Sequence, residues 1–196
     1  MTPSRPGEIV IVSGLPRSGT SMMMRMIVAG GVPPLVDGVR PPDVDNPLGY
    51  FEYEPVKRTR EDPTWLGLAG GHVVKMVHVL LRDLPAGYPY AVVMMHRDPG
   101  EVVASQQKML ARLGRAGGSA AGDALQRVFA AQLADVERQV AARAEFRTLD
   151  VHYARVLDDP AAQAGRVAAF LGLGTAPLMA AAVDATLYRN RAAPQR

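Results

Sequence analysis

The stretch from Ile9 to Met26 reads IVIVSGLPRSGTSMMMRM, and it decides the fold. It opens with a short apolar run that predicts a buried strand. A loop follows that holds two glycines, an arginine between them, and two hydroxyl residues at its end. Methionines and an isoleucine then recur at helical spacing. This order of strand, glycine-rich loop and helix predicts a phosphate cradle, because loop N–H groups and the helix dipole both favour an anion.

The details of this loop differ from those of an ATP-binding loop. Gly14 and Gly19 fit the glycines of the Walker A pattern GxxxxGK[ST], but Thr20 stands at the lysine position. The basic residue is Arg17, inside the loop. Because the lysine is missing, the usual contact to the β- and γ-phosphates of ATP is missing too. The loop therefore favours another phosphate ligand, and a plain turn with a solvated arginine is the structural alternative.

Composition sets limits on fold and function. The chain has 196 residues, a formal net charge of +3 and 48% hydrophobic residues, which fits one globular domain over 1–196, with flexible tails at 1–7 and 192–196. The small basic excess suits an anionic ligand and argues against nucleic acid as a partner. The chain has no cysteine, which excludes disulfides and thiolate metal sites. We expect no membrane span and no signal peptide, hence a cytoplasmic location.

Strands alternate with helices along the rest of the chain. Further strands are predicted at His72–Val77, at Tyr90–Met95, which is nearly all apolar, and at Phe146–Val151. Helices are predicted near Pro55, from Asp98, over Ala124–Arg143, from Asp159 to Gly172 and over Pro177–Val183, with loops over Gly30–Asn46 and Gly114–Gly122. This alternation predicts an α/β fold, a parallel sheet with helices on both faces. Ligands of such sheets bind beyond the carboxyl ends of the strands.

A second anion site is predicted at the end of the third strand. Arg97 follows that strand directly, and Ser105 lies eight residues later, about two turns into the next helix. An arginine at this position would stand beside the glycine-rich loop and could bind a phosphate through two parallel hydrogen bonds. Taken singly, Arg97 fits a surface ion pair and Ser105 fits a hydroxyl bonded to its own helix.

These two motifs resemble those of sulfotransferases that use 3′-phosphoadenosine 5′-phosphosulfate (PAPS). Pro16–Ser21 is similar to the family's 5′-phosphosulfate loop, and Arg97–Ser105 to its 3′-phosphate motif. Asn46–Glu52 and Tyr153–Gly172 resemble further segments of bacterial sulfotransferase-like proteins. The resemblance implies a P-loop NTPase-like fold and transfer of a sulfuryl group from PAPS, with release of adenosine 3′,5′-bisphosphate (PAP).

The resemblance also implies which residues hold the donor, without a metal. These are Pro16, Arg17, Ser18, Gly19, Thr20, Ser21, Arg97 and Ser105, with Arg189 and Arg191 as a loose substitute for an absent Arg-Lys-Gly segment. Two further departures concern the cytosolic branch of the family. Met22 replaces a tryptophan after the loop, which leaves the adenine contact unassigned, and the segment from Lys75 to His78 is one residue longer than that branch's Lys-Thr-His.

Sulfuryl transfer needs a group that stabilises the leaving phosphate and a base that takes the acceptor proton. Arg17 is the candidate for the first role, and Lys75 either contacts the transferring group or only ends its strand. Glu52, Glu54 and His78 are the candidate bases, in that order of preference. If the segment around Pro55 is extended, both glutamates face the same way; if Pro55 starts a helix, Glu54 instead favours its N-terminus.

Other assignments remain open in the sequence. The acceptor is expected to be a hydroxyl or amine of a small molecule, of unspecified class. The alternative functions are a P-loop kinase that uses ATP and Mg²⁺, and a non-catalytic nucleotide-binding protein of the same fold. We interpret the methionine run as core, Trp65 as packing, and both His96 and His152 as structural. The oligomeric state is not encoded in any recognisable pattern.

Overall fold

The computed structural model describes residues 7–41, 49–112 and 120–184. These residues form a four-stranded parallel sheet in the order β2-β1-β3-β4. The strands are β1 (Ile9–Gly14), β2 (Val73–Val77), β3 (Tyr90–His96) and β4 (Phe146–His152). The four predicted strands and the α/β class are therefore confirmed, with strand ends shifted by one or two residues.

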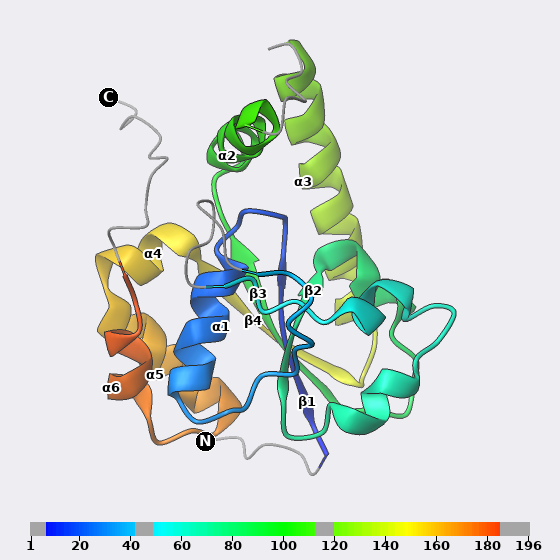
Figure 1. The fold of residues 1–196 in the computed structure, drawn as a ribbon, viewed down its shortest axis with the longest axis vertical. Helices are drawn as coiled ribbons and strands as arrows, with labels where there is room; N and C mark the ends of the chain where they lie inside the picture. Colours follow the sequence, from blue (N-terminus) through cyan, green and yellow to red (C-terminus); the bar gives the residue numbers. More distant parts are fainter. Residues whose placement is uncertain (1–6, 42–48, 113–119, 185–196) are drawn as a thin grey trace.

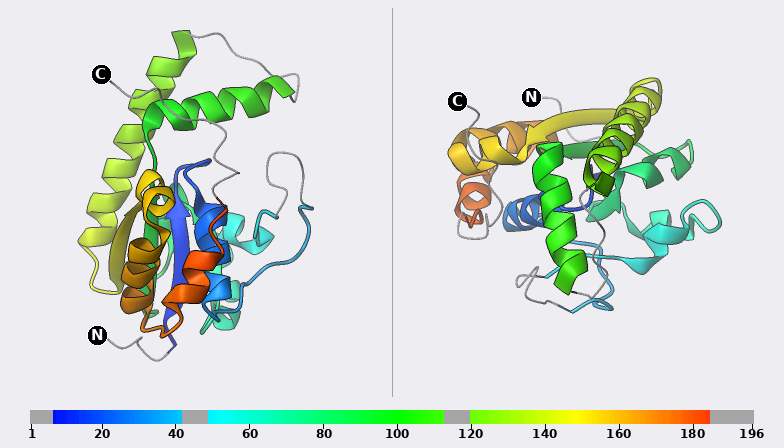
Figure 2. Two further views of the ribbon diagram at one scale, coloured as in Figure 1. Left: turned by 90° about the vertical axis from the view of Figure 1, so that its left-hand side faces the viewer. Right: turned by 90° about the horizontal axis from the view of Figure 1, so that it is seen from above.

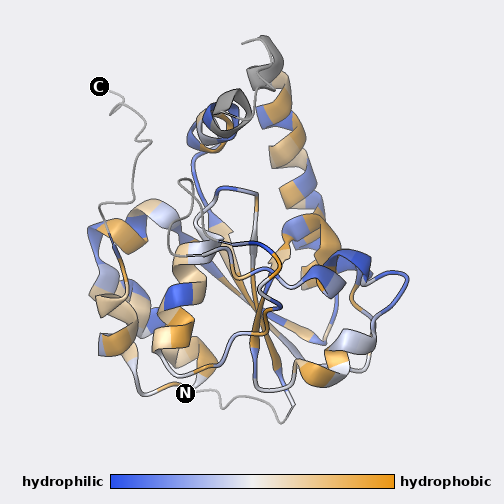
Figure 3. Ribbon diagram, in the orientation of Figure 1, coloured by the Kyte–Doolittle hydropathy of each residue, from blue (hydrophilic) through white to orange (hydrophobic). Residues whose placement is uncertain are grey.

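Each central strand sends alternate side chains to opposite faces of the sheet, as the two-residue period of a strand requires. In β1, Val10 and Val12 belong to one core cluster, whereas Ile9 and Ile11 belong to the other. Both faces are therefore apolar and buried, which is why the strand reads as a continuous hydrophobic run. In Figure 3, hydrophobic residues follow these strands through the centre of the molecule.

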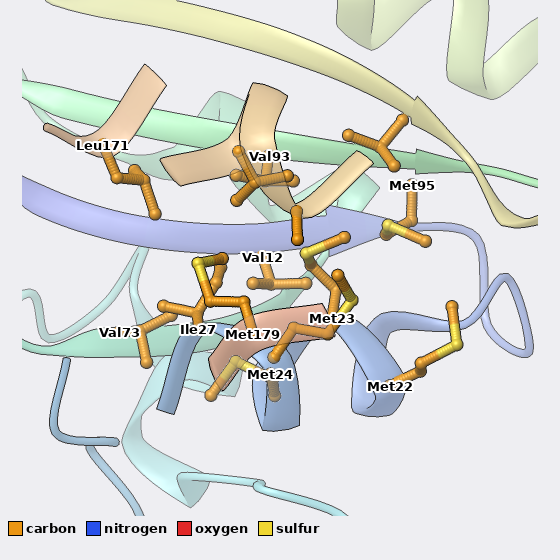
Figure 4. Close-up of a cluster of buried hydrophobic side chains, with 14 of the residues drawn as sticks. Val12, Met22, Met23, Met24, Ile27, Val73, Val93, Met95, Leu171 and Met179 are labelled. Carbon is orange, nitrogen blue, oxygen red and sulfur yellow. The ribbon is translucent and has the colours of Figure 1, made fainter. Parts of the chain in front are cut away.

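One face of the sheet is covered by four α-helices (Figure 1). They are α1 (Thr20–Ala29), α4 (Tyr153–Asp158), α5 (Pro160–Leu171) and α6 (Ala176–Ala181). The methionines of α1 fill this core beside Val12 and Met179 (Figure 4), and Met23, Met24 and Met26 have no exposed surface. The interpretation of the methionine run as core is confirmed.

The other face is covered by α3 (Ala120–Ala141) and by three 3₁₀ helices. These are η1 (Glu54–Arg58), η2 (Thr64–Leu68) and η3 (His78–Asp83). Trp65 is buried here and donates from Nε1 to the Thr59 hydroxyl at 3.1 Å, so it packs as expected. Helix α2 (Pro99–Arg112) leaves β3 and, with the first half of α3, stands beyond the carboxyl edge of the sheet (Figure 2).

The structure corrects the prediction for the longest helix. It begins at Ala120, within the expected Gly114–Gly122 loop, and ends at Ala141. Its fully buried apolar residues among those described lie near its C-terminal end, where Val136 and Val140 pack on the sheet. Val128 is exposed, because that part of the helix extends past the strands.

The Gly30–Asn46 segment is only partly a loop over the site. Pro34 pairs in parallel with Val73, at the start of β2, and so lies at the edge opposite the carboxyl ends. The chain then turns back, since the Asp37 carboxylate accepts from the Glu54 N–H at 2.6 Å. Residues 42–48, including the first part of Asn46–Glu52, lie outside the described residues.

Capping residues explain several helix ends. Asp98 accepts from the Glu101 N–H at 3.0 Å at the start of α2, and Asp159 accepts from the Ala162 N–H at 2.9 Å at the start of α5. Helix α5 ends at Gly172, as predicted. The sequence analysis missed α4, which follows β4 without an intervening loop. Among the helices of the described residues, none combines the length and apolar character that crossing a membrane requires.

Candidate functional site

The loop after β1 can only be built with glycines at its two ends. Gly14 has φ +151°, and a Cβ there would lie 2.6 Å from the Met95 carbonyl oxygen. Gly19 has φ +98°, and a Cβ there would lie 2.4 Å from Cδ2 of Tyr153. These conformations bring the loop against β3 and against the first residue of α4. The glycines therefore fix the loop to the carboxyl edge of the sheet.

Arg17 lies at the apex of this loop in a left-handed conformation, with φ +71°. This conformation costs a non-glycine residue about 1 kcal/mol or more. Its Nε donates to the Ser105 hydroxyl of α2 at 3.0 Å, across 88 positions of sequence. The structure thus joins the two segments that the sequence analysis assigned to the two phosphates of one donor. Backbone strain of this kind is typical of residues held for function.

Arg97 contacts the backbone of Arg17. Its Nη1 donates to the Arg17 carbonyl oxygen at 3.1 Å, and its Nε donates to the Glu101 carboxylate at 2.8 Å. Its guanidinium also lies over the Tyr153 ring, 4.6 Å from the centroid. Only 8% of the side chain is exposed. Arg97 is therefore held rigidly by three contacts, and an anion would have to share it with Glu101.

The remaining loop residues fall into two groups. Ser18 is fully buried, its N–H donates to the Leu15 carbonyl at 3.1 Å, and its hydroxyl makes no hydrogen bond within the described residues. The side chain of Ser18 therefore points to the interior of the protein and not to solvent. Thr20 and Ser21 begin α1 and are partly exposed, as is Pro16. Of the predicted loop hydroxyls, only those of Thr20 and Ser21 lie at a partly open helix N-terminus.

A basic cluster lies next to the loop, where Arg40, Lys57 and Lys75 surround Glu52. Arg40 Nη1 is 2.8 Å from Glu52 Oε1, and the ammonium groups of Lys57 and Lys75 each lie 3.9 Å from that carboxylate. Lys75 also donates to the Tyr50 carbonyl oxygen. One carboxylate therefore faces an excess of positive charge at the end of β2.

Lys75 is the cluster member whose protonation changes near neutral pH. Burial lowers its pKa from 10.5 to about 8. The Glu52 carboxylate opposes this shift, whereas Arg40, Arg17 and Lys57 add to it. The positive charge of Arg17 is one of the causes that lower this pKa, so the two groups interact electrostatically.

The three candidate bases have different surroundings. Glu52 lies inside the basic cluster, with a side chain that is 20% exposed. Glu54 begins η1 and pairs with Lys57 at 2.5 Å, which realises the helical alternative for this segment. His78 is 2% exposed at the start of η3, and its ring nitrogens make no hydrogen bond within the described residues. Burial lowers the pKa of His78, and the Gly14 backbone opposes part of that shift.

Two residues of this region were not singled out by the sequence analysis. Arg40 lies in a proline-rich segment without periodicity, and it stacks over Tyr50 at 3.4 Å from the ring centroid. Tyr153 was part of a resembling segment but had no role; it supports both Gly19 and Arg97. Arg189 and Arg191 lie outside the described residues, so their assignment stays a prediction.

The fold is similar to those of solved sulfotransferase structures. The sulfotransferase domain from the curacin biosynthetic pathway is 14% identical, with a TM-score of 0.56 over 94% of this chain and 89% of that one. Sulfotransferase STF1 from Mycobacterium tuberculosis is 20% identical, with a TM-score of 0.54 over 92% and 71% of the chains. Retinol dehydratase, solved with androsterone and the inactive cofactor PAP, is 18% identical, with a TM-score of 0.54 over 95% and 66%. These similarities confirm the P-loop NTPase-like fold.

The sequence itself matches a family model. A search of curated proteins found no match. The model described as "Sulfotransferase family" matches residues 79–177, half of the 196-residue chain. The matched region contains Arg97, Ser105 and Tyr153, whereas the glycine-rich loop precedes it. The chain therefore belongs to the sulfotransferase family.

Proposed function

We propose that this protein transfers a sulfuryl group from PAPS to a hydroxyl or amine of a small molecule. The observation that carries the proposal is the hydrogen bond between Arg17 and Ser105, which unites two predicted phosphate-binding segments at one edge of the sheet. The partly open start of α1 and the adjoining basic cluster support it, because both favour an anion with several charges. PAPS, with two phosphate groups and a sulfate, fits such a site.

The chain's own residues would act mainly by positioning and by charge. In the reaction, an acceptor oxygen or nitrogen bonds to sulfur while the bond between sulfur and the 5′-phosphate oxygen breaks. Arg17 and Lys75 would stabilise the negative charge that builds up on that oxygen. Arg97 and Ser105 would hold the 3′-phosphate, and Thr20 and Ser21 would bind the 5′-phosphate.

Among the candidate bases, we favour Glu52. Its carboxylate lies 3.9 Å from the ammonium group of Lys75 on β2, the strand that pairs with β1. His78 is buried, and Glu54 is part of η1. The proton of the acceptor would pass to the Glu52 carboxylate. A Glu52→Gln variant that keeps the wild-type turnover would exclude this role.

The proposal can be tested without knowing the acceptor. We expect adenosine 3′,5′-bisphosphate to bind in calorimetric titration without a metal, and to bind more tightly than ATP with or without Mg²⁺. Arg97→Ala should weaken this binding about tenfold, since the charged hydrogen bonds it would make are each worth roughly 1.5–3 kcal/mol and part of that is already shared with Glu101. Arg138→Ala, an exposed arginine of α3, is the matched control and should bind normally.

The competing functions predict other results. Preference for ATP with Mg²⁺ would support a P-loop kinase and contradict the proposal. Tight bisphosphate binding without sulfuryl transfer to any acceptor would support a non-catalytic nucleotide-binding protein. Equal binding by Arg97→Ala and wild type would remove Arg97 from the site while leaving the family assignment in place.

The binding of the bisphosphate should also depend on the protonation of Lys75. Its pKa of about 8 means that the ammonium is mostly charged at pH 7 and mostly neutral at pH 9.5. Phosphate groups are mostly in their doubly ionised form over this range, because their second pKa is about 6. We expect up to about tenfold weaker binding at pH 9.5 than at pH 7, which is roughly 1.4 kcal/mol. Calorimetry at the two pH values measures this difference.

A Lys75→Arg variant provides the control, because arginine stays charged at both pH values. Its affinity should change little between pH 7 and 9.5. Stability should change in the opposite direction to affinity: between about pH 8 and 10.5 the unfolded chain binds more protons at Lys75 than the folded one, so this group makes folding more favourable as the pH rises. A wild-type affinity that is flat across this range would separate Lys75 from the donor.

A further inference from the structure

A histidine and two carboxylates meet on the α3 side of the sheet, beside the donor site. His96 Nε2 lies 2.9 Å from Asp150 Oδ1 and 3.7 Å from Glu137 Oε1. All three candidate ligand atoms lie within 4.8 Å of one another. We propose that His96, Asp150 and Glu137 form a binding site for a divalent transition metal ion of the zinc type.

The spacing of these atoms suits such an ion. Zinc binds imidazole nitrogen and carboxylate oxygen at about 2.0–2.1 Å, so tetrahedral ligands lie about 3.3 Å apart. The observed separations bracket this value and need only side-chain adjustment. An imidazole with two carboxylates favours zinc over Ca²⁺ or Mg²⁺, which prefer oxygen ligands alone. The two carboxylates also match the charge of a divalent ion.

The scaffold holds the three ligands on different elements. His96 is the last residue of β3, and Asp150 lies on the neighbouring strand β4, so the hydrogen-bonded register fixes their separation. Glu137 comes from α3, which lies alongside β4 (Figure 2). In the sequence it directly follows Val136, which is buried. A bound metal would therefore tie α3 to the carboxyl ends of two strands.

The surroundings leave these ligand atoms available. Glu137 Oε1 is shielded from solvent and makes no hydrogen bond within the described residues. Arg166 donates to the backbone carbonyl of Asp150 at 3.2 Å, and this hydrogen bond does not involve the carboxylate. The ring of His152 lies 5.2 Å from that of His96, but His152 is not one of the three clustered ligands, so water would complete the coordination. The alternative is a cluster held by hydrogen bonds and ion pairs, without metal affinity.

The position of the cluster connects it to the donor site. Arg97 follows His96 directly, and Tyr153 follows His152. A metal at the ends of β3 and β4 would thus fix the backbone that presents the arginine and its aromatic support. This inference does not depend on sulfuryl transfer, because metal binding is measured directly.

The test is a titration of the full chain, without a polyhistidine tag, with ZnCl₂ in a buffer that does not chelate metals. We expect one equivalent to bind per chain with micromolar or tighter affinity. His96→Gln, Asp150→Asn and Glu137→Gln should each weaken binding tenfold or more. His72→Gln is the matched control, since this half-buried imidazole bonds to the Gly70 carbonyl just before the start of β2, away from the carboxyl ends of the strands. Circular dichroism of each variant checks the fold.

Other outcomes overturn the inference. If no binding is detected at zinc concentrations 100 times a micromolar dissociation constant, the cluster is an ion pair only. If the three variants bind zinc as the wild type does, the metal is held elsewhere. If Ca²⁺ binds equally well and His96→Gln leaves that binding unchanged, the cluster is a carboxylate patch without a transition-metal site. Because bisphosphate binding is a separate measurement, failure here leaves the proposed function untouched.

Discussion

A Gly19→Ala variant is expected to lose about 3 kcal/mol of stability and most of its affinity for adenosine 3′,5′-bisphosphate. Two costs add at this position. An alanine at φ +98° pays about 1 kcal/mol or more for a left-handed backbone. Its Cβ would also lie 2.4 Å from the Tyr153 ring, and overpacking of this kind costs about 1–3 kcal/mol. For a chain of this length, the melting temperature should fall by roughly 10 °C.

Gly31 offers a matched control for the backbone term alone. It has φ +100°, and a Cβ there would meet nothing within 4 Å. Gly31→Ala should therefore cost only about 1 kcal/mol and leave bisphosphate binding unchanged. In a Tyr153→Ala background, the cost of Gly19→Ala should fall to the Gly31 level, because the clashing ring atoms are gone. Equal costs in both backgrounds would contradict the proposed clash.

An Arg17→Gly variant should keep its fold and lose about 100-fold in affinity for the bisphosphate. Glycine relieves the strain at φ +71°, which offsets its greater chain entropy and the lost hydrogen bond to Ser105. We therefore expect a stability within about 1 kcal/mol of the wild type. The affinity falls because two charged hydrogen bonds to the donor, each worth roughly 1.5–3 kcal/mol, cannot form. Thermal unfolding and calorimetry measure the two quantities separately.

Two further substitutions at this position separate charge from shape. Arg17→Ala keeps the unfavourable backbone and should be about 1 kcal/mol less stable than Arg17→Gly, with the same loss of affinity. Arg17→Lys retains the charge without the planar fork, so its affinity should be intermediate. If Arg17→Gly binds the bisphosphate as tightly as the wild type, the loop is not the anion site.

The parts of the fold that depend on local pattern were predictable from the sequence. Strands β1 and β3 contain continuous apolar runs, and the caps at Asp98, Asp159 and Gly172 have direct chemical signatures. Helix α4 was missed because it follows its strand without a break. The start of α3 was placed too late because alanine and glycine give no periodic signal there. These errors lie where neighbouring elements, and not local sequence, decide the structure.

The site was predictable where its motifs lie at the ends of neighbouring strands. The approach of Arg17 to Arg97 and Ser105 follows from strand order, because the ends of adjacent parallel strands β1 and β3 meet at one edge. The position of Arg40 depends on a turn of the chain back to Glu52, which has no sequence signature. His96 and His152 were interpreted as structural, and the contact of His96 with Glu137 arises from packing between separate elements.

The methionine-rich core has a consequence for the oxidation of this protein. The chain has no cysteine, so its ten methionines are its only sulfur targets for oxidants such as hydrogen peroxide. Eight of them, Met22, Met23, Met24, Met26, Met76, Met94, Met95 and Met179, are buried. Peroxide can reach those on α1 only when the helix detaches from the sheet, so their rate of sulfoxide formation records how often the helix that carries the glycine-rich loop opens.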